Sequence, residues 1–127
     1  MMKNFAAHYI YIPDRGFFKQ SGVSVDDIGR VAAVFALDDE VESVEWHPGV
    51  IVILPASPNI NNDETLIAVV SSLFTHQKAV FSHLTDSNKE MVDRLILNDQ
   101  TMVAYLFFPF DFTSMKLDGE TRHRQLR

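Results

Sequence analysis

The feature that most constrains this fold is a change of hydrophobic period at Pro55. Before it, residues 22–26 alternate between apolar and polar, and residues 50–54 form a continuous apolar run, as in half-buried and fully buried strands. After it, apolar residues recur at the helical spacing over residues 66–77. Residues 101–110 then form a second long apolar run. The pattern predicts strands at both ends of the chain and helices between them.

The predicted helical insertion covers about residues 62–98. Asn61 or Asn62 can cap its first helix, and the Ser-x-x-Glu capping box that begins at Ser87 indicates a second helix. The sequence does not fix where the helices break between Thr75 and Ser87.

We therefore expect a single α+β domain over residues 1–127. Its core would be a small antiparallel β-sandwich or curled sheet built from both termini, with strands in residues 5–55 and 101–121. The short helical insertion would pack on this sheet. The apolar fraction of 46% is ordinary for a soluble protein, and the chain is long enough to bury a core.

Charge and composition exclude several classes of partner. The net charge is −6, and the arginines Arg122, Arg124 and Arg127 lie at an end that we expect to fray. Nucleic-acid binding requires a clustered basic surface, so we expect none. The apolar run of nine residues at 102–110 is far below the roughly 20 that a membrane helix needs, so we expect no membrane partner.

Cysteine is absent from the chain, which excludes a disulfide framework, a cysteine metal site and a cysteine nucleophile. Residues 1–8 carry only a short apolar patch, too weak for a signal peptide. We expect a cytoplasmic protein.

An ordered set of features extends over residues 8–55: an aromatic strand, a Val-x-Val-Asp segment at residues 23–26, a Gly-Arg-Val start at residues 29–31, and the apolar residues 49–55. This set resembles the strands that precede the catalytic barrel in amidohydrolase-superfamily enzymes. Residues 110–122 are similar to the closing strands of some members. The resemblance covers about half of the chain, and it implies an accessory β-sandwich made from both chain ends.

The metal ligands of that family do not carry over to this chain. In the family, the apolar strand ends in Pro-Gly and a His-x-His pair follows, whereas Pro55 is followed by Ala56 and no His-x-His occurs. The family barrel takes about 250 residues, but only about 45 residues separate the two β segments. The resemblance therefore implies an accessory domain that lacks the catalytic barrel.

Five histidines are the natural candidates for metal ligands: His8, His47, His76, His83 and His123. On one continuous helix, His76 and His83 would lie about 10 Å apart, too far for one metal. His47 follows Trp46, and this pair is either a pocket corner or a turn with its tryptophan packed on the sheet edge. We expect no metal ligand and no cofactor.

Acidic residues give no site either. Residues 38–45 lack the glycine and ligand spacing of a calcium loop, which indicates a solvated loop. Asp26, Asp27 and Asp111 could supply paired carboxylates, but no nucleophile motif accompanies them. We expect no catalytic residue.

Adjacent aromatic residues bear on assembly. Neighbours on a strand point to opposite faces, so one member of each pair in residues 17–18 and 107–108 needs cover on the second face. The inserted helices or a second subunit could supply it. We expect a homodimer, with room for another protein partner.

These features predict a non-catalytic binding or assembly protein related to the accessory β-domain of amidohydrolases. One alternative is a small enzyme or ligand-binding protein with a pocket between helices and sheet, lined by Trp46, His47, His76 and His83. Another is an unrelated α+β domain. The sequence assigns no reaction.

Overall fold

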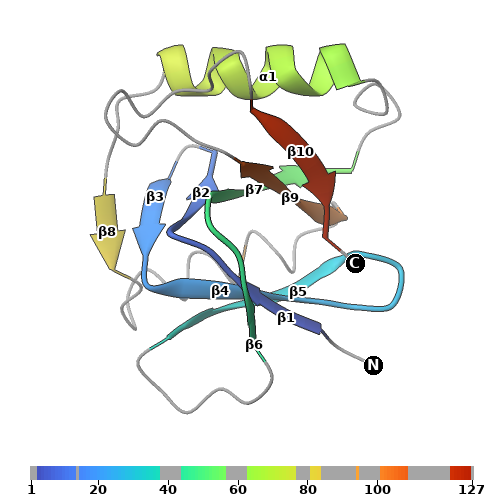
Figure 1. Cartoon of the computed structure of the whole chain (residues 1–127). Coiled ribbons are helices and arrows are strands. Elements are labelled where there is room, and N and C mark those ends of the chain that lie inside the picture. The colour runs from blue at the N-terminus through green and yellow to red at the C-terminus, as the bar shows by residue number, and fades with distance from the viewer. Residues whose placement is uncertain are drawn as a thin grey trace.

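The computed structural model describes residues 3–13, 15–37, 44–56, 63–76, 81–83, 94, 101–108 and 121–126. This part of the chain forms ten strands and one long helix (Figure 1). Their bounds are β1 Lys3–Ala6, β2 Tyr9–Ile12, β3 Gly16–Lys19, β4 Ser21–Val25, β5 Val31–Ala36, β6 Val44–Trp46, β7 Val50–Pro55, α1 Asp63–His76, β8 Phe81–His83, β9 Met102–Phe108 and β10 Arg122–Gln125.

The strands form two mixed sheets. The four-stranded sheet has the order β5-β4-β1-β6, and the six-stranded sheet has the order β10-β9-β7-β2-β3-β8. The predicted α+β character is confirmed in the coarse sense that the described residues are mostly β with one helix. The prediction of purely antiparallel pairing is wrong, because the pairs β1–β6, β2–β7 and β3–β8 are parallel.

The six-stranded sheet packs on both of its faces, and β7 in its middle shows why. Its apolar run alternates between two core clusters: Ile51 and Ile53 join one, whereas Val50, Val52 and Leu54 join the other. All five side chains are buried. A strand covered on both faces needs a continuous apolar sequence, which explains the composition of residues 50–54.

The first cluster contains residues from both sheets, and we call it the inter-sheet core. It includes Phe5, Val23 and Val34 of the four-stranded sheet and Ile10, Ile51 and Leu106 of the six-stranded sheet. The second cluster joins the six-stranded sheet to α1, which lies across it in Figure 1. The helix contributes Leu66, Val70 and Phe74, with Leu73 packed against them, from the residues 66–77 whose helical spacing predicted an apolar face.

Both aromatic pairs are covered within this chain. Phe17 packs in the helix-side cluster and Phe18 in the inter-sheet core, and both are buried. Phe107 and Phe108 divide in the same way, although Phe108 is only partly buried. Of the two covers that the sequence allowed, the helix therefore supplies the second face, and these residues do not require a second subunit.

Three short strands differ from the sequence prediction. β6 occupies the end of the predicted solvated loop at residues 38–45 together with Trp46. β8 lies inside the predicted helical insertion at residues 62–98 and pairs in parallel with β3. The end that we expected to fray forms β10, which pairs with β9, and Leu126 beyond it is 1% exposed. In each case pairing with a distant strand outweighs the weak local signal.

The first helix, α1, ends at His76, within the interval from Thr75 to Ser87 in which the sequence left the break open. The second predicted helix, beginning at Ser87, lies outside the described residues except for Arg94, which is helical. The predicted strand residues 109–120 also lie outside them.

Candidate functional site

The candidate site lies where the open edges of the two sheets meet. β6 is an edge strand of the four-stranded sheet, and β10 is an edge strand of the six-stranded sheet. A side-chain contact joins them, because Arg124 Nη2 lies 3.4 Å from His47 Nε2.

Strand alternation sorts the side chains of β6 onto two faces. Glu45 is in register with Phe5 of β1, which is buried in the inter-sheet core, so Glu45 also faces the six-stranded sheet. His47 returns to that face two residues later, with its ring 6.2 Å from the Phe5 ring. Trp46 points the other way, is 52% exposed, and packs edge-on against the His8 ring at 4.9 Å.

The same alternation orients β10. Arg124 is in register with Leu106, a member of the inter-sheet core, and Leu126 is buried in that core. His123 lies on the opposite face, where its ring contacts the ring of Phe107. Arg124 is therefore directed toward the four-stranded sheet.

Two adjoining cavities, which together we call the inter-sheet cleft, lie at this edge. The larger has a volume of about 360 Å³ and is lined by Lys3, Phe5, Glu45, Arg124, Gln125 and Leu126. The smaller has a volume of about 190 Å³ and is lined by His47, Pro48, Leu106, Phe108 and Arg124. Arg124 borders both cavities. The larger one has a buried apolar floor beneath charged side chains, and the smaller one is mainly apolar.

His47 lies between two opposite charges. Its Nε2 is 3.4 Å from Glu45 Oε1 and 3.4 Å from Arg124 Nη2. One ring nitrogen cannot serve both groups at once, since it accepts from Arg124 when unprotonated and donates to Glu45 when protonated. Within the part of the chain that the structure describes, Glu45 and Arg124 form no ion pair with each other.

Backbone contacts fix this corner of the molecule. The His47 amide donates to the Ala6 carbonyl at 2.8 Å, and the His8 amide donates to the Gly49 carbonyl at 3.1 Å. The Gly49 amide in turn donates to His8 Nδ1 at 3.2 Å. These bonds hold residues 47–49 against the end of β1, so the smaller cavity has a fixed wall.

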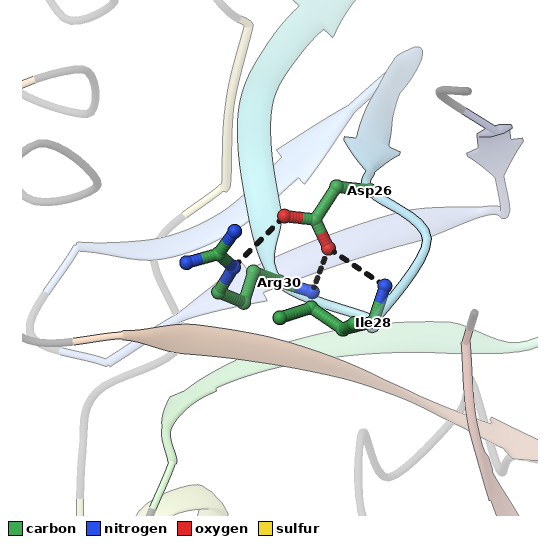
Figure 2. A network of polar contacts seen from close by, with 3 residues as sticks. All are labelled: Asp26, Ile28 and Arg30. Carbon is green, nitrogen blue, oxygen red and sulfur yellow. Dashed lines mark hydrogen bonds and ion pairs between the residues drawn. The ribbon is translucent and has the colours of Figure 1, made fainter.

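Asp26, a candidate for paired carboxylates, stabilises the turn between β4 and β5 instead (Figure 2). Its Oδ1 accepts hydrogen bonds from the backbone amides of Ile28 at 3.1 Å and Arg30 at 2.9 Å, and its Oδ2 pairs with Arg30 Nε at 2.9 Å. The hydrogen bond from the Arg30 amide, supported by the Arg30 side chain, holds the pKa of the Asp26 carboxyl below its ordinary value.

The remaining predicted candidates lie wholly or partly outside the described residues. His76 ends α1 and His83 ends β8, and their side chains lie outside the described residues. The acidic residues 38–43 and Asp111 also lie outside them. The predicted pocket between helices and sheet does not coincide with the inter-sheet cleft, because Leu66, Val70 and Phe74 fill the α1 interface with apolar side chains.

Sequence reasoning singled out His47 and Trp46 but missed Lys3 and Arg124. No local signal could have found Arg124, since residues 122–126 read Arg-His-Arg-Gln-Leu and show no apolar–polar alternation. In the described residues, no group of three or more His, Asp or Glu side chains could hold a metal ion. No described helix is both long and apolar enough to span a membrane.

No protein-family model, curated protein or solved structure matches this chain.

Proposed function

We propose that this protein is a non-catalytic binding module and that the inter-sheet cleft holds a small organic ligand. The observation that carries the proposal is the convergence of charged groups from both sheets, Lys3 and Glu45 on one side and Arg124 on the other, above an apolar floor. Ligand sites are typically concave and mainly apolar, with a few placed polar groups, and they start at about 300 Å³. The larger cavity reaches that volume at the small end; its lining is mainly polar, with Phe5 and Leu126 as its apolar part, and the smaller cavity beside it is mainly apolar.

A second candidate, a small acid–base enzyme, draws its support from the contact of Glu45 with His47. The Glu45 side chain is 62% exposed, however, so water solvates its carboxylate. A catalytic pair works best where water is excluded and a reacting group is held beside it. The arrangement therefore favours binding over catalysis.

A survey of small ligands by amide NMR tests the binding function. A set of organic anions, cations, zwitterions and neutral compounds should contain members that shift the amides of residues 45–47 and 124–126. Arg124→Gln should weaken those shifts, whereas Arg122→Gln should not, because Arg122 lies on the same strand but lines neither cavity. If no compound of any class shifts the cleft amides, the proposed function is wrong.

We further propose that the chain is related to the accessory β-domain of amidohydrolase-superfamily enzymes and that its two sheets form a β-sandwich. The proposal is supported by the six-stranded sheet, which joins β2, β3 and β7 with β9 and β10 from the other end of the chain. The inter-sheet core supports the sandwich. Methyl NOEs between β5 and β9, two strands of different sheets that contact each other, would test the packing, and their absence would contradict it.

We also propose that the protein forms a homodimer in the cytoplasm. The support for a homodimer is the β5 edge at Val31–Ala36, which has no charged residue or proline and pairs, among the described residues, only with β4. Such edges readily pair with strands of other chains. Light scattering should give a dimeric mass, and Ala33→Lys should give a monomer. A monomeric mass for the unaltered chain would refute dimerisation.

A further inference from the structure

We propose that the ligand of the inter-sheet cleft is a zwitterion, namely a free α-amino acid with an apolar side chain. This inference rests on the proposed binding function and assigns the chemical class of its ligand. Three features carry it: two opposite charges held apart, the short span between them, and the apolar cavity beside them.

The first feature is the separation of Glu45 from Arg124. Opposite charges in one cleft ordinarily pair, yet each of these groups contacts His47 instead. Arg124 thus keeps guanidinium donors that can form a bidentate contact with a carboxylate, and the Glu45 carboxylate can accept from an ammonium group. A plain anion would be attracted by Arg124 and Lys3 but repelled by Glu45, whereas a zwitterion uses charges of both signs.

The second feature is the distance between the two charges. Glu45 Oε1 and Arg124 Nη2 both lie 3.4 Å from the same nitrogen of His47, so at most twice that distance separates them. The carboxylate and ammonium groups of an α-amino acid share one carbon atom. Such a molecule can therefore form both charge-assisted contacts at once, while a ligand with widely separated charges cannot.

The third feature is the smaller cavity. It opens from Arg124 and is lined by Pro48, Leu106 and Phe108, so a side chain on the ligand's α-carbon would enter apolar surroundings. Its volume of about 190 Å³ suits a single aliphatic or aromatic side chain rather than a long chain. Burial of that side chain supplies the non-polar part of the affinity.

Four probes measure how much each charged group of the ligand contributes to binding: L-phenylalanine, N-acetyl-L-phenylalanine, L-phenylalaninamide and benzyl alcohol. The second lacks the ammonium group, the third lacks the carboxylate, and the fourth lacks both. The dissociation constant of each is measured from the amide shifts of residues 45–47 and 124–126. L-Phenylalanine is expected to bind at least about 5-fold more tightly than any of the others, since each loses a charge-assisted contact at a partly exposed site.

Two variants assign the contacts. Glu45→Gln should weaken the binding of L-phenylalanine by about 3- to 10-fold without weakening the binding of the N-acetyl derivative. Only L-phenylalanine has an ammonium group that can contact Glu45. Arg124→Gln should weaken the binding of both probes, and Arg122→Gln should change the binding of neither. Unchanged thermal melting in each variant shows that the fold is intact.

The outcomes distinguish the two levels of the proposal. Equal or tighter binding of the N-acetyl derivative would overturn the zwitterion and leave a simple carboxylate site. Cleft shifts with other compounds but with none of the four probes would also overturn the amino-acid inference, while the binding function stands. If nothing shifts the cleft amides, both fail.

Discussion

Replacement of Gly49 by alanine tests the geometry that supports the cleft. Gly49 has a φ of +128°, a backbone conformation that residues with a side chain rarely adopt. An added Cβ would lie 2.3 Å from the Phe107 carbonyl oxygen and 3.2 Å from the Phe108 Cβ. The close approach of β7 to β9 therefore leaves room only for glycine.

Two costs contribute to the expected loss of stability. A side chain on a left-handed backbone costs about 1–3 kcal/mol, and displacement of a packed backbone group costs about another 1–3 kcal/mol. The carbonyl belongs to a buried strand, so it cannot rotate away as the end of a flexible side chain could. Gly49→Ala should lower the free energy of unfolding by about 2–6 kcal/mol.

Urea denaturation followed by the fluorescence of Trp46, the one tryptophan in the chain, measures this loss. With a slope of about 1–3 kcal/mol per molar urea, the midpoint should fall by about 1 M or more. Gly29→Ala is the control, because Gly29 shares a positive φ of 87° but lies in the β4–β5 turn. If Gly49→Ala costs no more than the control, the crowding of β7 against β9 is refuted.

Three further substitutions test the packing and the turn. Gly22→Ala should lower the free energy of unfolding, measured by urea denaturation, by about 1–3 kcal/mol, because the added Cβ would lie 2.5 Å from the Phe35 ring. Replacing that ring by a smaller side chain, with Phe35→Leu, should recover part of the loss. Leu126→Ala should cost about 2–4 kcal/mol, since the side chain is 1% exposed in the inter-sheet core; a cost below about 1 kcal/mol would contradict the anchoring of β10. Asp26→Asn should destabilise the protein at neutral pH, and the difference from the unaltered chain should shrink as pH falls below about 4. The sign follows from the lowered pKa of Asp26: the carboxylate stabilises the fold above its unfolded-state pKa, and that contribution is lost as the folded-state group becomes protonated. A difference in stability between Asp26→Asn and the unaltered chain that does not change with pH would refute this role of the carboxylate.

Local sequence patterns were sufficient for the longer elements. The alternation in residues 22–26, the continuous apolar run at 50–54 and the helical spacing after residue 62 correspond to β4, β7 and α1. These elements can be predicted because each buries one face or both faces, and burial gives the apolar residues of a strand or a helix a recognisable spacing. Short strands give no such pattern, and β6 and β8 have only three residues each.

The sequence predicted neither which strands pair nor where the candidate site lies. The parallel pairing of β1 with β6 brings Phe5 beside Glu45 across 40 positions of sequence, and no local signal encodes that register. Arg124 reaches the cleft only because β10 pairs with β9, in register with Leu106. His47 could be singled out from its tryptophan and proline neighbours, but its two charged contacts depend on both pairings.

Charged side chains that face inward at a sheet edge have a second explanation, because they also discourage unwanted pairing with other chains. The two explanations differ in what they require of Glu45. Protection of the edge needs only a charge, so Glu45→Lys should preserve it, and light scattering should give the same mass as for the unaltered protein. Recognition of an ammonium group needs a negative charge, so the same substitution should abolish the preference for L-phenylalanine over its N-acetyl derivative. A variant that keeps this preference would assign Glu45 to edge protection alone, because a lysine cannot accept a hydrogen bond from the ligand's ammonium group.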